Sequence, residues 1–438
     1  MHDRLDILFV SERALWPADQ GFRVHGAAMA RALAARGLRV GVAVMEETDA
    51  AAPQGLRDMV LQWPVPTVAD VAELRSAWRG PLQRMRDKVA SHQGVDVARL
   101  AGLVALARER RPGAVVALGP HGPLLLAALG RESFPDVRRV WYAADDLVRF
   151  HLGCLRREPM LQWPVRLRRL AVDGVIESLL CGAVDGVIGV SPSDTAALRL
   201  FTRRPAVCIP NGVDLDYFHP QRGLPEAGGT GDGDADDGRP RPVRGGRSVV
   251  LWGRMDFEPN ADAAAWFADE VWPTLRFRQP DAVFDVVGKH PTDRVRALAR
   301  RGLNGASGVR VVGEVADVRP WAHAASAVVL PMRCGGGIKN KLLEAAALGR
   351  PIVASPRAVA GLDLPRGVDS PVTVCRTPKE WVTAIRRLWA DPVHAARQGA
   401  AARRWVQRTH TWDAAAAKLA GWLSGPVAVA ARHTELGP

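Results

Sequence analysis

The chain has 438 residues, of which 47% are hydrophobic and 24% charged, and this composition excludes a disordered or a fibrous protein. The formal net charge is +13, but the positive charge is dispersed arginine and does not indicate nucleic-acid binding. The five cysteines are widely spaced and form no C-x-x-C pair, which argues against a disulfide framework or a cysteine zinc site and fits a reducing cytosol.

The first half of the chain alternates strand-like and helix-like segments. The apolar run at 5–10 predicts a strand that is too short for a signal peptide. Val24–Arg36 predicts a helix that ends at Gly37, and a second strand follows it, which completes a β-α-β unit. The second and later strands of this half are expected, in chain order, at Val40–Val44, Ala114–Leu118, Val140–Ala143 and Gly186–Val190. Residues 70–112 are expected to be mostly helical.

Residues 221–247 interrupt this pattern. They are rich in glycine, proline, aspartate and arginine and contain almost no large apolar side chain, so they cannot bury a core. They include Asp234-Ala235-Asp236, a D-x-D pattern that holds a divalent metal in some sugar transferases. No strand precedes it here, and we interpret it as part of a solvated linker.

The second half restarts the alternation and predicts a second α/β domain. Strands and helices are expected, in chain order, at Ser248–Trp252, Asn260–Arg278, Ala282–Val287, Arg294–Arg301, Val309–Val312, Ala327–Leu330, Lys339–Leu348 and Pro351–Ala354. The expected organisation is a first domain over 1–215, a linker over 216–247, a second domain over 248–395 and a helical segment over 396–438 that crosses back to the first domain.

A glycine-rich loop carries most of the chemical information. Gly335–Gly337 follow an apolar strand and directly precede a helix, so backbone N–H groups and the helix N-terminus are expected to attract an anion. Arg333, Lys339 and Lys341 surround the loop, although the chain has only six lysines. Glu344 lies on the same helical face as Lys341 and could accept hydrogen bonds from a ribose. The alternative is a capped surface helix with an ion pair. The Walker A spacing is absent.

These motifs resemble the donor-site signature of glycosyltransferase family 4, whose members are retaining enzymes of the GT-B fold. The resemblance covers nearly the whole chain in order, and its lysine-asparagine-lysine variant is similar to a bacterial exopolysaccharide-associated subgroup. The matching segments are Gly21 with Arg23, Ser191–Asp194, Asn211–Asp214 with Phe218 and Pro220, Trp252–Met255, Pro259–Ala263, and Gly336–Ala354. The resemblance implies two doubly wound, Rossmann-like α/β domains that face each other across a cleft.

The chain departs from the family pattern at three positions. Gly336 stands where the family often has a glutamate that contacts the transferred sugar, and Pro259 stands where it often has a lysine. The N-terminal loop has Gln20 in place of one of two glycines. We expect Lys339 and Lys341 to take over the charge of the missing lysine.

Two further groups are candidate catalytic residues. His121 lies in a glycine-proline loop after a predicted strand, where the family often has a histidine near the transferred sugar; the alternative is a structural histidine. Asp145 and Asp146 follow the strand Val140–Ala143 and could orient acceptor hydroxyls or act as a base. The alternative is a pair that caps the next segment.

The resemblance assigns donor binding to residues from both domains. The expected donor-binding residues are Gly21, Arg23, Arg254, Arg333, Gly336, Gly337, Lys339, Lys341 and Glu344. The implied activity is transfer of a hexose, with retention, from a nucleotide-diphosphate sugar to a glycan or lipid-linked acceptor in bacterial polysaccharide synthesis. No metal and no cofactor are expected, and the expected location is cytoplasmic. The alternatives are a nucleotide-sugar epimerase and a nucleotide-sugar-binding protein without turnover.

Segment 156–170 suggests a membrane contact. We weighed it as an interface with anionic lipid, because arginines lie beside apolar side chains there. The arginines are Arg156, Arg157, Arg166, Arg168 and Arg169, and the apolar residues are Met160, Leu161, Trp163 and Leu167. Pro159 and Pro164 argue against one continuous amphipathic helix, so we expect a peripheral patch on the inner face of the plasma membrane. The alternative is a solvated basic loop.

Overall fold

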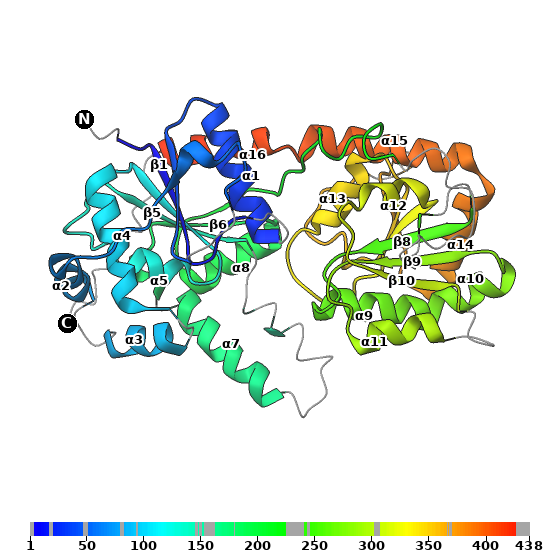
Figure 1. Cartoon of the computed structure of the whole chain (residues 1–438), viewed down its shortest axis with the longest axis horizontal. Helices are drawn as coiled ribbons and strands as arrows, with labels where there is room; N and C mark the ends of the chain where they lie inside the picture. The colour runs from blue at the N-terminus through cyan, green and yellow to red at the C-terminus, as the bar shows by residue number, and fades with distance from the viewer. Residues whose placement is uncertain are drawn as a thin grey trace, which may run out of the picture. The chain divides into compact units, whose positions relative to one another are not determined.

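The computed structural model describes residues 4–16, 21–46, 51–78, 83–92, 95–144, 148, 151–152, 163–178, 180–224, 241–242, 246–301, 307–365, 367 and 370–425. The chain forms two compact units. Unit 1 comprises residues 1–211 and 412–438, and unit 2 comprises residues 212–411. Each unit is a parallel β-sheet with helices on both faces (Figure 1).

Unit 1 contains a seven-stranded sheet in the order β3-β2-β1-β4-β5-β6-β7. Its strands are β1 (Ile7–Ser11), β2 (Val40–Val44), β3 (Val60–Leu61), β4 (Ala114–Leu118), β5 (Arg138–Ala144), β6 (Gly186–Gly189) and β7 (Ala206–Cys208). Both β1 and β4 are buried along their whole length, which is typical of central strands of a parallel sheet.

Helices cover both faces of the unit 1 sheet. Helices α1 (Gly21–Ala35) and α16 (Trp412–Ser424) pack together on one face, although they lie at opposite ends of the chain (Figure 1). The other face carries α2 (Val68–Ala77), α3 (Gln83–His92), α4 (Val97–Arg110), α5 (Gly122–Ala127), α7 (Trp163–Ser178) and α8 (Pro192–Thr202). The expected helical content of 70–112 is therefore supplied by three separate helices.

Unit 2 contains a six-stranded sheet in the order β10-β9-β8-β11-β12-β13. Its strands are β8 (Ser248–Trp252), β9 (Val283–Val287), β10 (Val309–Gly313), β11 (Ala327–Leu330), β12 (Ile352–Ala354) and β13 (Thr373–Val374). Its helices are α9 (Glu258–Trp266), α10 (Trp272–Arg278), α11 (Asp293–Arg296), α12 (Arg319–Ala324), α13 (Asn340–Ala347), α14 (Pro378–Ala390) and α15 (Pro392–Thr409). Helices α9 and α11 lie on one face of this sheet, and α12 and α13 lie on the other (Figure 1).

The single helix expected over Asn260–Arg278 is divided. Helix α9 is followed by a π-helical turn at Phe267–Val271 and then by α10. Pro273 has no backbone N–H and cannot continue the regular hydrogen-bond ladder, so the chain accommodates it in a widened turn. Phe267 packs edge-to-face against Phe284 and Trp381, and this aromatic contact anchors the turn in the core.

The division into units differs from the expected boundaries. Segment 212–224 belongs to unit 2, because Val213 N–H donates to the His410 carbonyl at 3.0 Å and Arg403 donates to the Phe218 carbonyl at 2.9 Å. The expected boundary at 395 lies inside α15, and the chain returns to unit 1 only at Trp412. Residues 225–240 and 243–245 of the expected linker lie outside the described residues.

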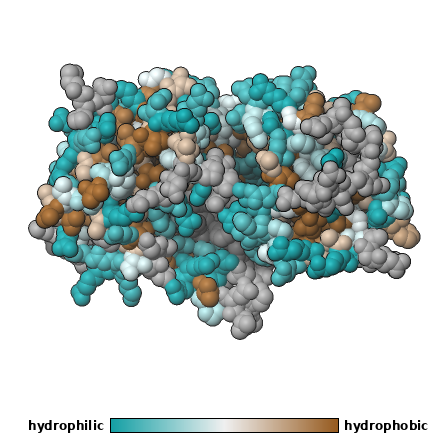
Figure 2. Space-filling model, in the orientation of Figure 1, coloured by the Kyte–Doolittle hydropathy of each residue, from teal (hydrophilic) through white to brown (hydrophobic). Residues whose placement is uncertain are grey.

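Hydrophilic residues cover much of the face shown in Figure 2, with hydrophobic residues in separate groups among them. Among the described residues, every helix is too short or too polar to cross a bilayer.

Candidate functional site

The glycine-rich loop of unit 2 lies at the carboxyl edge of its sheet, between β11 and α13. The strand order reverses between β8 and β11, because the chain passes outward from β8 to β9 and β10 and then returns to β11. Ligands of open α/β sheets bind beyond the carboxyl ends of the strands at such a switch point. Residues that follow Trp252 at the end of β8 and Leu330 at the end of β11 therefore form the candidate site.

Two glycines keep side chains out of this edge. Gly253 and Gly288 follow β8 and β9 with φ of +145° and +146°. A Cβ atom on Gly288 would lie 1.8 Å from the Gly253 carbonyl oxygen, and a Cβ atom on Gly253 would lie 2.7 Å from the Lys341 Nζ atom. The loops after β8 and β9 therefore meet backbone to backbone, and the Lys341 ammonium lies directly beside them.

Lys341 reaches this edge from the first turn of α13. Its Nζ atom donates a hydrogen bond to the Asn260 Oδ1 atom on α9 at 2.6 Å. The Asn260 amide in turn donates to the Arg254 carbonyl at 2.8 Å, which fixes the amide orientation. Burial, opposed by Glu344 and reinforced by Lys339, lowers the pKa of Lys341 to about 7. The site thus holds an ammonium group that a neighbouring anion would stabilise.

Glu344 lies one turn further along α13. Its Oε2 atom accepts a hydrogen bond from the Trp252 indole N–H at 2.8 Å. No partner of its Oε1 atom lies among the described residues. Burial raises the pKa of Glu344, against the opposing effects of the Trp252 hydrogen bond and of Lys341. The indole therefore holds one carboxylate oxygen and leaves the other to accept from a ligand hydroxyl.

The glycine loop folds back onto Lys339. Gly335 and Gly337 have φ of +95° and +64°, which favours glycine over other residues. The Lys339 ammonium donates to the carbonyls of Gly336 and Gly337. A Cβ atom on Gly335 would lie 3.5 Å from both the Lys339 Nζ atom and the Pro259 ring. Lys339 therefore lies close to the proline that stands where the resemblance predicted a lysine.

The two predicted arginines of unit 2 have carboxylate partners. Arg254 binds Asp256 through Nε and Nη2 at 3.0 and 2.8 Å, and Arg333 pairs with Asp262 at 3.2 Å. Because these carboxylates offset part of the arginine charge, the lysines of α13 are the stronger candidates for a bound anion.

Unit 1 has its own switch point, between β1 and β4. Residues that follow Ser11 and Leu118 meet there, because these two residues are register partners at the strand ends. His121 lies at this point, directly before α5, and its Nδ1 atom contacts the Glu12 carboxylate. His121 is buried, with 8% of its surface exposed. The carboxylate accepts a hydrogen bond from Nδ1, which leaves Nε2 of a neutral ring as an acceptor.

The other predicted residues of unit 1 are less fully described. Gly21 is the first residue of α1, and Arg23 lies in its first turn. Asp145 and Asp146 lie outside the described residues, as do Asp234-Ala235-Asp236 and residues 156–162. Within the described part of the chain, no three histidine, cysteine, aspartate or glutamate side chains lie close enough to hold a metal ion.

Sequence reasoning missed three residues of these two sites. Asn260 and the Trp252 indole belong to recognised motifs, but no spacing rule indicates that they hold Lys341 and Glu344. Glu12 follows the first strand, and its pairing with His121 depends on the adjacency of β1 and β4. The ends of neighbouring parallel strands are the signal that could have identified it.

Part of unit 2 is similar to a known protein family. Residues 246–391, which include the whole unit 2 site, match the protein family described as "Glycosyl transferases group 1". Over 231 residues the chain is 32% identical to the GDP-mannose-dependent alpha-(1-6)-phosphatidylinositol monomannoside mannosyltransferase of Mycolicibacterium smegmatis. That match covers 50% of this chain and 56% of the relative. The chain therefore spans little more than half the length of the curated relatives that it matches.

Solved glycosyltransferase structures share the fold at lower identity. Sucrose-phosphate synthase from Thermosynechococcus elongatus is 18% identical with a TM-score of 0.63, over 95% of this chain and 98% of that protein. Anabaena HepE in complex with UDP and glucose is 16% identical with a TM-score of 0.61, over 97% of this chain and all of that protein. The chain therefore has the GT-B fold of two Rossmann-like units, and residues 246–391 of its second unit are similar to the glycosyl transferases group 1 family.

Proposed function

We propose that this chain is a retaining glycosyltransferase that moves a hexose from a nucleotide-diphosphate sugar to a hydroxyl of a glycan or lipid-linked acceptor in bacterial polysaccharide synthesis. The observation that carries the proposal is the Lys341 and Glu344 pair at the switch point of unit 2, with Asn260 and Trp252 holding the two side chains. The matched family and the nucleotide sugars named for its relatives support this proposal.

The lysines supply what the leaving diphosphate needs. Cleavage of the bond between the sugar and the diphosphate leaves negative charge on the diphosphate oxygens. Lys339 and Lys341 stabilise that charge, and the N-terminus of α13 adds its dipole. Lys339 lies beside Pro259, so it supplies a cation where the family pattern would place one. Arg254 and Arg333, which already hold carboxylates, contribute less.

Glu344 recognises the nucleoside. A carboxylate oxygen held by the Trp252 indole is well oriented to accept hydrogen bonds from ribose hydroxyls. Gly336, in place of a carboxylate, leaves the transferred sugar to be bound by backbone groups of the loop and by residues of unit 1. In unit 1 we assign His121 to sugar or acceptor orientation, with Glu12 holding its ring; Gly21, Arg23, Asp145 and Asp146 stay candidates there.

A panel of UDP-, GDP- and ADP-sugars tests the proposal and selects the base, which the relatives leave open because they are named with both GDP and UDP. A donor present at 100 times its Kd raises the free energy of unfolding by about 2.7 kcal/mol, which a thermal shift detects. Transfer to an acceptor, with the anomeric configuration read by NMR, supports the retaining enzyme. Epimerised donor would instead indicate a nucleotide-sugar epimerase. Donor binding without any sugar release would indicate a nucleotide-sugar-binding protein without turnover.

We propose that no metal takes part, because lysines and a helix N-terminus neutralise the diphosphate. Activity should then persist in excess EDTA, and deletion of residues 226–238 should leave donor binding unchanged. Activity that is lost in EDTA and restored by Mg²⁺ or Mn²⁺ would contradict this proposal.

Helix α7 supports a peripheral contact with an anionic membrane at the inner face of the plasma membrane. It begins at Trp163 and runs without a break to Ser178, because Pro164 lies in its first turn, where no N–H is needed. Pro164 therefore lies at the start of α7, and the part of the segment that contains Pro159 lies outside the described residues. Trp163, Val165 and Leu167 are exposed by 39%, 60% and 48%. In the region of α7, Figure 2 shows hydrophobic surface among hydrophilic residues.

Charge reversal on α7 tests this contact. Each basic residue near an anionic bilayer contributes about 1 kcal/mol, so Arg168→Glu with Arg169→Glu should abolish co-sedimentation with anionic vesicles at low salt. Arg386→Glu with Arg387→Glu on the exposed side of α14 makes the same charge change in unit 2 and serves as the matched control. Equal sedimentation of both variants, or none of the unchanged chain, would remove the membrane contact.

A further inference from the structure

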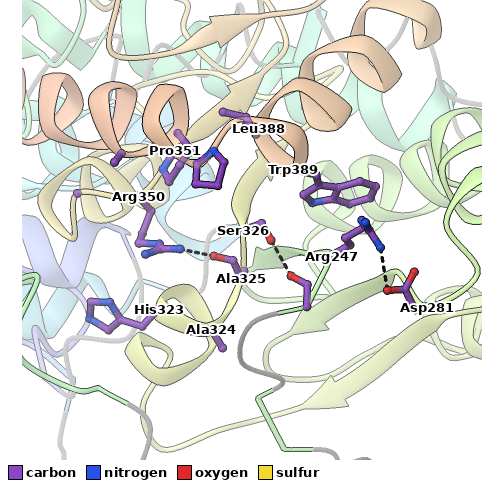
Figure 3. Close-up of a pocket in the computed structure, with 15 residues that line it drawn as sticks. Arg247, Asp281, His323, Ala324, Ala325, Ser326, Arg350, Pro351, Leu388 and Trp389 are labelled. Atoms are coloured by element: carbon purple, nitrogen blue, oxygen red, sulfur yellow. Dashed lines mark hydrogen bonds and ion pairs between the residues drawn. The ribbon is translucent and has the colours of Figure 1, made fainter.

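Unit 2 has a cavity of about 600 Å³ at the opposite edge of its sheet from the glycine-rich loop (Figure 3). Arg247, Ser326 and Pro351 line it, and they directly precede or join the amino ends of β8, β11 and β12. Helices α14 and α15 close it through Trp389 and Pro392. The candidate donor site lies at the carboxyl ends of the same strands, so the two sites are separate.

Two buried N–H donors line this cavity without acceptors. The Arg350 guanidinium donates through Nη2 to the Ala325 carbonyl, but its buried Nε atom has no partner among the described residues. The buried Trp389 indole N–H also has no partner there. Figure 3 shows Arg350 and Trp389 on either side of Ser326. Burial lowers the pKa of Arg350, which indicates a guanidinium that has lost water and gained no carboxylate.

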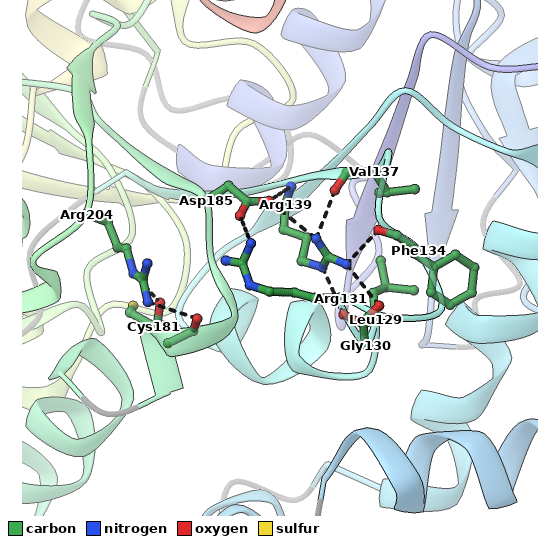
Figure 4. Close-up of polar contacts among 10 residues, drawn as sticks. Leu129, Gly130, Arg131, Phe134, Val137, Arg139, Cys181, Asp185 and Arg204 are labelled. Carbon is green, nitrogen blue, oxygen red and sulfur yellow. Dashed lines mark hydrogen bonds and ion pairs between the residues drawn. The ribbon is translucent and has the colours of Figure 1, made fainter. Parts of the chain in front are cut away.

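A buried arginine at the amino edge of the unit 1 sheet shows how a structural guanidinium is satisfied (Figure 4). Arg139, at the start of β5, donates to four backbone carbonyls at 2.8–3.0 Å, and its backbone N–H donates to Asp185 at 2.8 Å. Asp185 also pairs with Arg131 at 2.6 Å. Arg139 thus has its full set of acceptors, whereas Arg350 lines a cavity and has one acceptor for its guanidinium among the described residues.

The charge and polarity of the other residues that line the cavity indicate which ligand it could bind. Arg247 at the cavity pairs with Asp281 at 3.2 Å, so Arg350 carries the uncompensated positive charge. The His323 Nε2 atom lies 3.0 Å from the Arg222 carbonyl, and burial lowers the pKa of His323, which keeps that ring neutral. Leu388, Pro351 and Pro392 offer apolar surface. The cavity is therefore cationic at one end, donor-lined at the other and apolar between them.

We propose that this cavity binds a small hydroxylated organic anion, with its phosphate or carboxylate group on Arg350 and a further oxygen on the Trp389 indole N–H. Such a ligand supplies acceptors for both buried donors and a counter-charge for the guanidinium. The volume of the cavity lies within the range of about 300–1,000 Å³ that is typical of small-molecule sites. The site is independent of the proposed transfer reaction, since its residues belong to the opposite edge of the sheet.

The Trp389 indole N–H gives a local readout of binding. In the full chain labelled with ¹⁵N-tryptophan, the Trp389 resonance is assigned by its disappearance in Trp389→Phe. Glycerol 3-phosphate and glycerate at millimolar concentrations are the two probes, because they present a phosphate and a carboxylate on the same three-carbon skeleton. At least one of them should shift the Trp389 resonance downfield, and the response of each identifies the acid group that the site prefers.

Substitutions then place the anion. Arg350→Met should weaken the probe's Kd, measured by calorimetry, by about tenfold or more, since it removes the charged donor. Trp389→Phe, which keeps an aromatic ring, should weaken it less, and it serves as the second variant if Arg350→Met does not fold. Arg386→Met, an exposed arginine on α14, should leave the Kd unchanged.

Three results would overturn the proposal. The first is a Trp389 resonance that neither probe moves. The second is a Kd that Arg350→Met and Trp389→Phe leave unchanged. The third is a shift that Lys339→Met removes and Arg350→Met retains, because the anion would then occupy the donor site. Failure of nucleotide-sugar binding elsewhere in unit 2 would leave this test unaffected.

Discussion

The two units of this chain carry different groups at equivalent places in similar sheets. At the switch point of unit 2, Lys341 and Glu344 are held by an amide and an indole from neighbouring elements. At the switch point of unit 1, His121 contacts Glu12. The first arrangement offers a positioned ammonium group and suits a phosphate, whereas the second offers an oriented imidazole and suits a hydroxyl. Under the proposed function, one fold supports binding in one unit and orientation in the other, because function depends on which side chains follow the strands.

Replacing Lys341 should have the largest effect. Lys341→Met removes a buried ammonium that we assign to the leaving diphosphate, so we expect kcat/KM to fall about 100-fold or more, equivalent to roughly 3 kcal/mol. Steady-state kinetics with the donor selected by the panel measure this. Lys379→Met, an exposed lysine on α14, is the control and should behave as the unchanged chain. Similar kinetics for both variants would remove Lys341 from the donor site.

Replacing Glu344 separates nucleoside recognition from diphosphate binding. Glu344→Gln keeps the shape and one acceptor but loses the charge, and a hydrogen bond to a charged group contributes about 1.5–3 kcal/mol. Donor Kd should therefore rise by roughly 10- to 100-fold in calorimetry. Trp252→Phe removes only the indole N–H that orients the carboxylate. The donor Kd of this variant should therefore lie between that of the unchanged chain and that of Glu344→Gln. An unchanged Kd in a folded Glu344→Gln protein would exclude the ribose contact.

The pKa of Lys341 predicts a pH dependence of donor affinity. The pKa is about 7 in the unbound chain, and a neighbouring diphosphate raises it because it stabilises the charged form. Donor binding then takes up a proton above pH 7, so affinity falls as pH rises from about 7 toward the pKa of the complex, by at most about tenfold per pH unit.

Lys341→Arg keeps its charge over this range and should bind with little pH dependence. A donor affinity of the unchanged chain that is flat between pH 7 and 9 would show that Lys341 does not meet the diphosphate.

Glu12 tests the other half of the comparison and should have the smallest effect. Glu12→Gln retains a hydrogen-bond acceptor for His121 but removes the charge, so we expect kcat to fall by about tenfold or less while donor Kd stays unchanged. Glu12→Asp should restore part of the rate. A change in donor Kd without a change in kcat would place Glu12 in donor binding instead.

Much of the fold was predictable from local sequence patterns. Apolar runs such as Ala327–Leu330 and Ser248–Trp252 predicted central strands within a residue of their observed bounds, because strands buried on both faces must be apolar throughout. Helix bounds were less predictable. Helix α9 begins two residues before the expected start. The turn between α9 and α10 is π-helical, because Pro273 cannot continue the regular hydrogen-bond ladder.

The sequence predicted an anion site at the glycine-rich loop, which stays a prediction, but it did not predict how the side chains there are arranged. Glycines before a helix, with two lysines and a glutamate at helical spacing, were sufficient to predict an anion site, since helix periodicity places Lys341 and Glu344 on one face. The partners Asn260, Trp252 and Glu12 come from elements that are distant along the chain. Their contacts depend on strand order, which is a long-range property that local periodicity does not encode.

The sequence by itself determined two α/β units and a glycine-rich loop flanked by cationic residues, because local periodicity and composition encode both. The tertiary structure alone decided which partners those residues have. In the folded chain Arg254 and Arg333 pair with carboxylates. Lys339 lies close to Pro259, and Glu12 contacts His121. The physical reason is that charge and burial at each position depend on neighbours that only folding brings together.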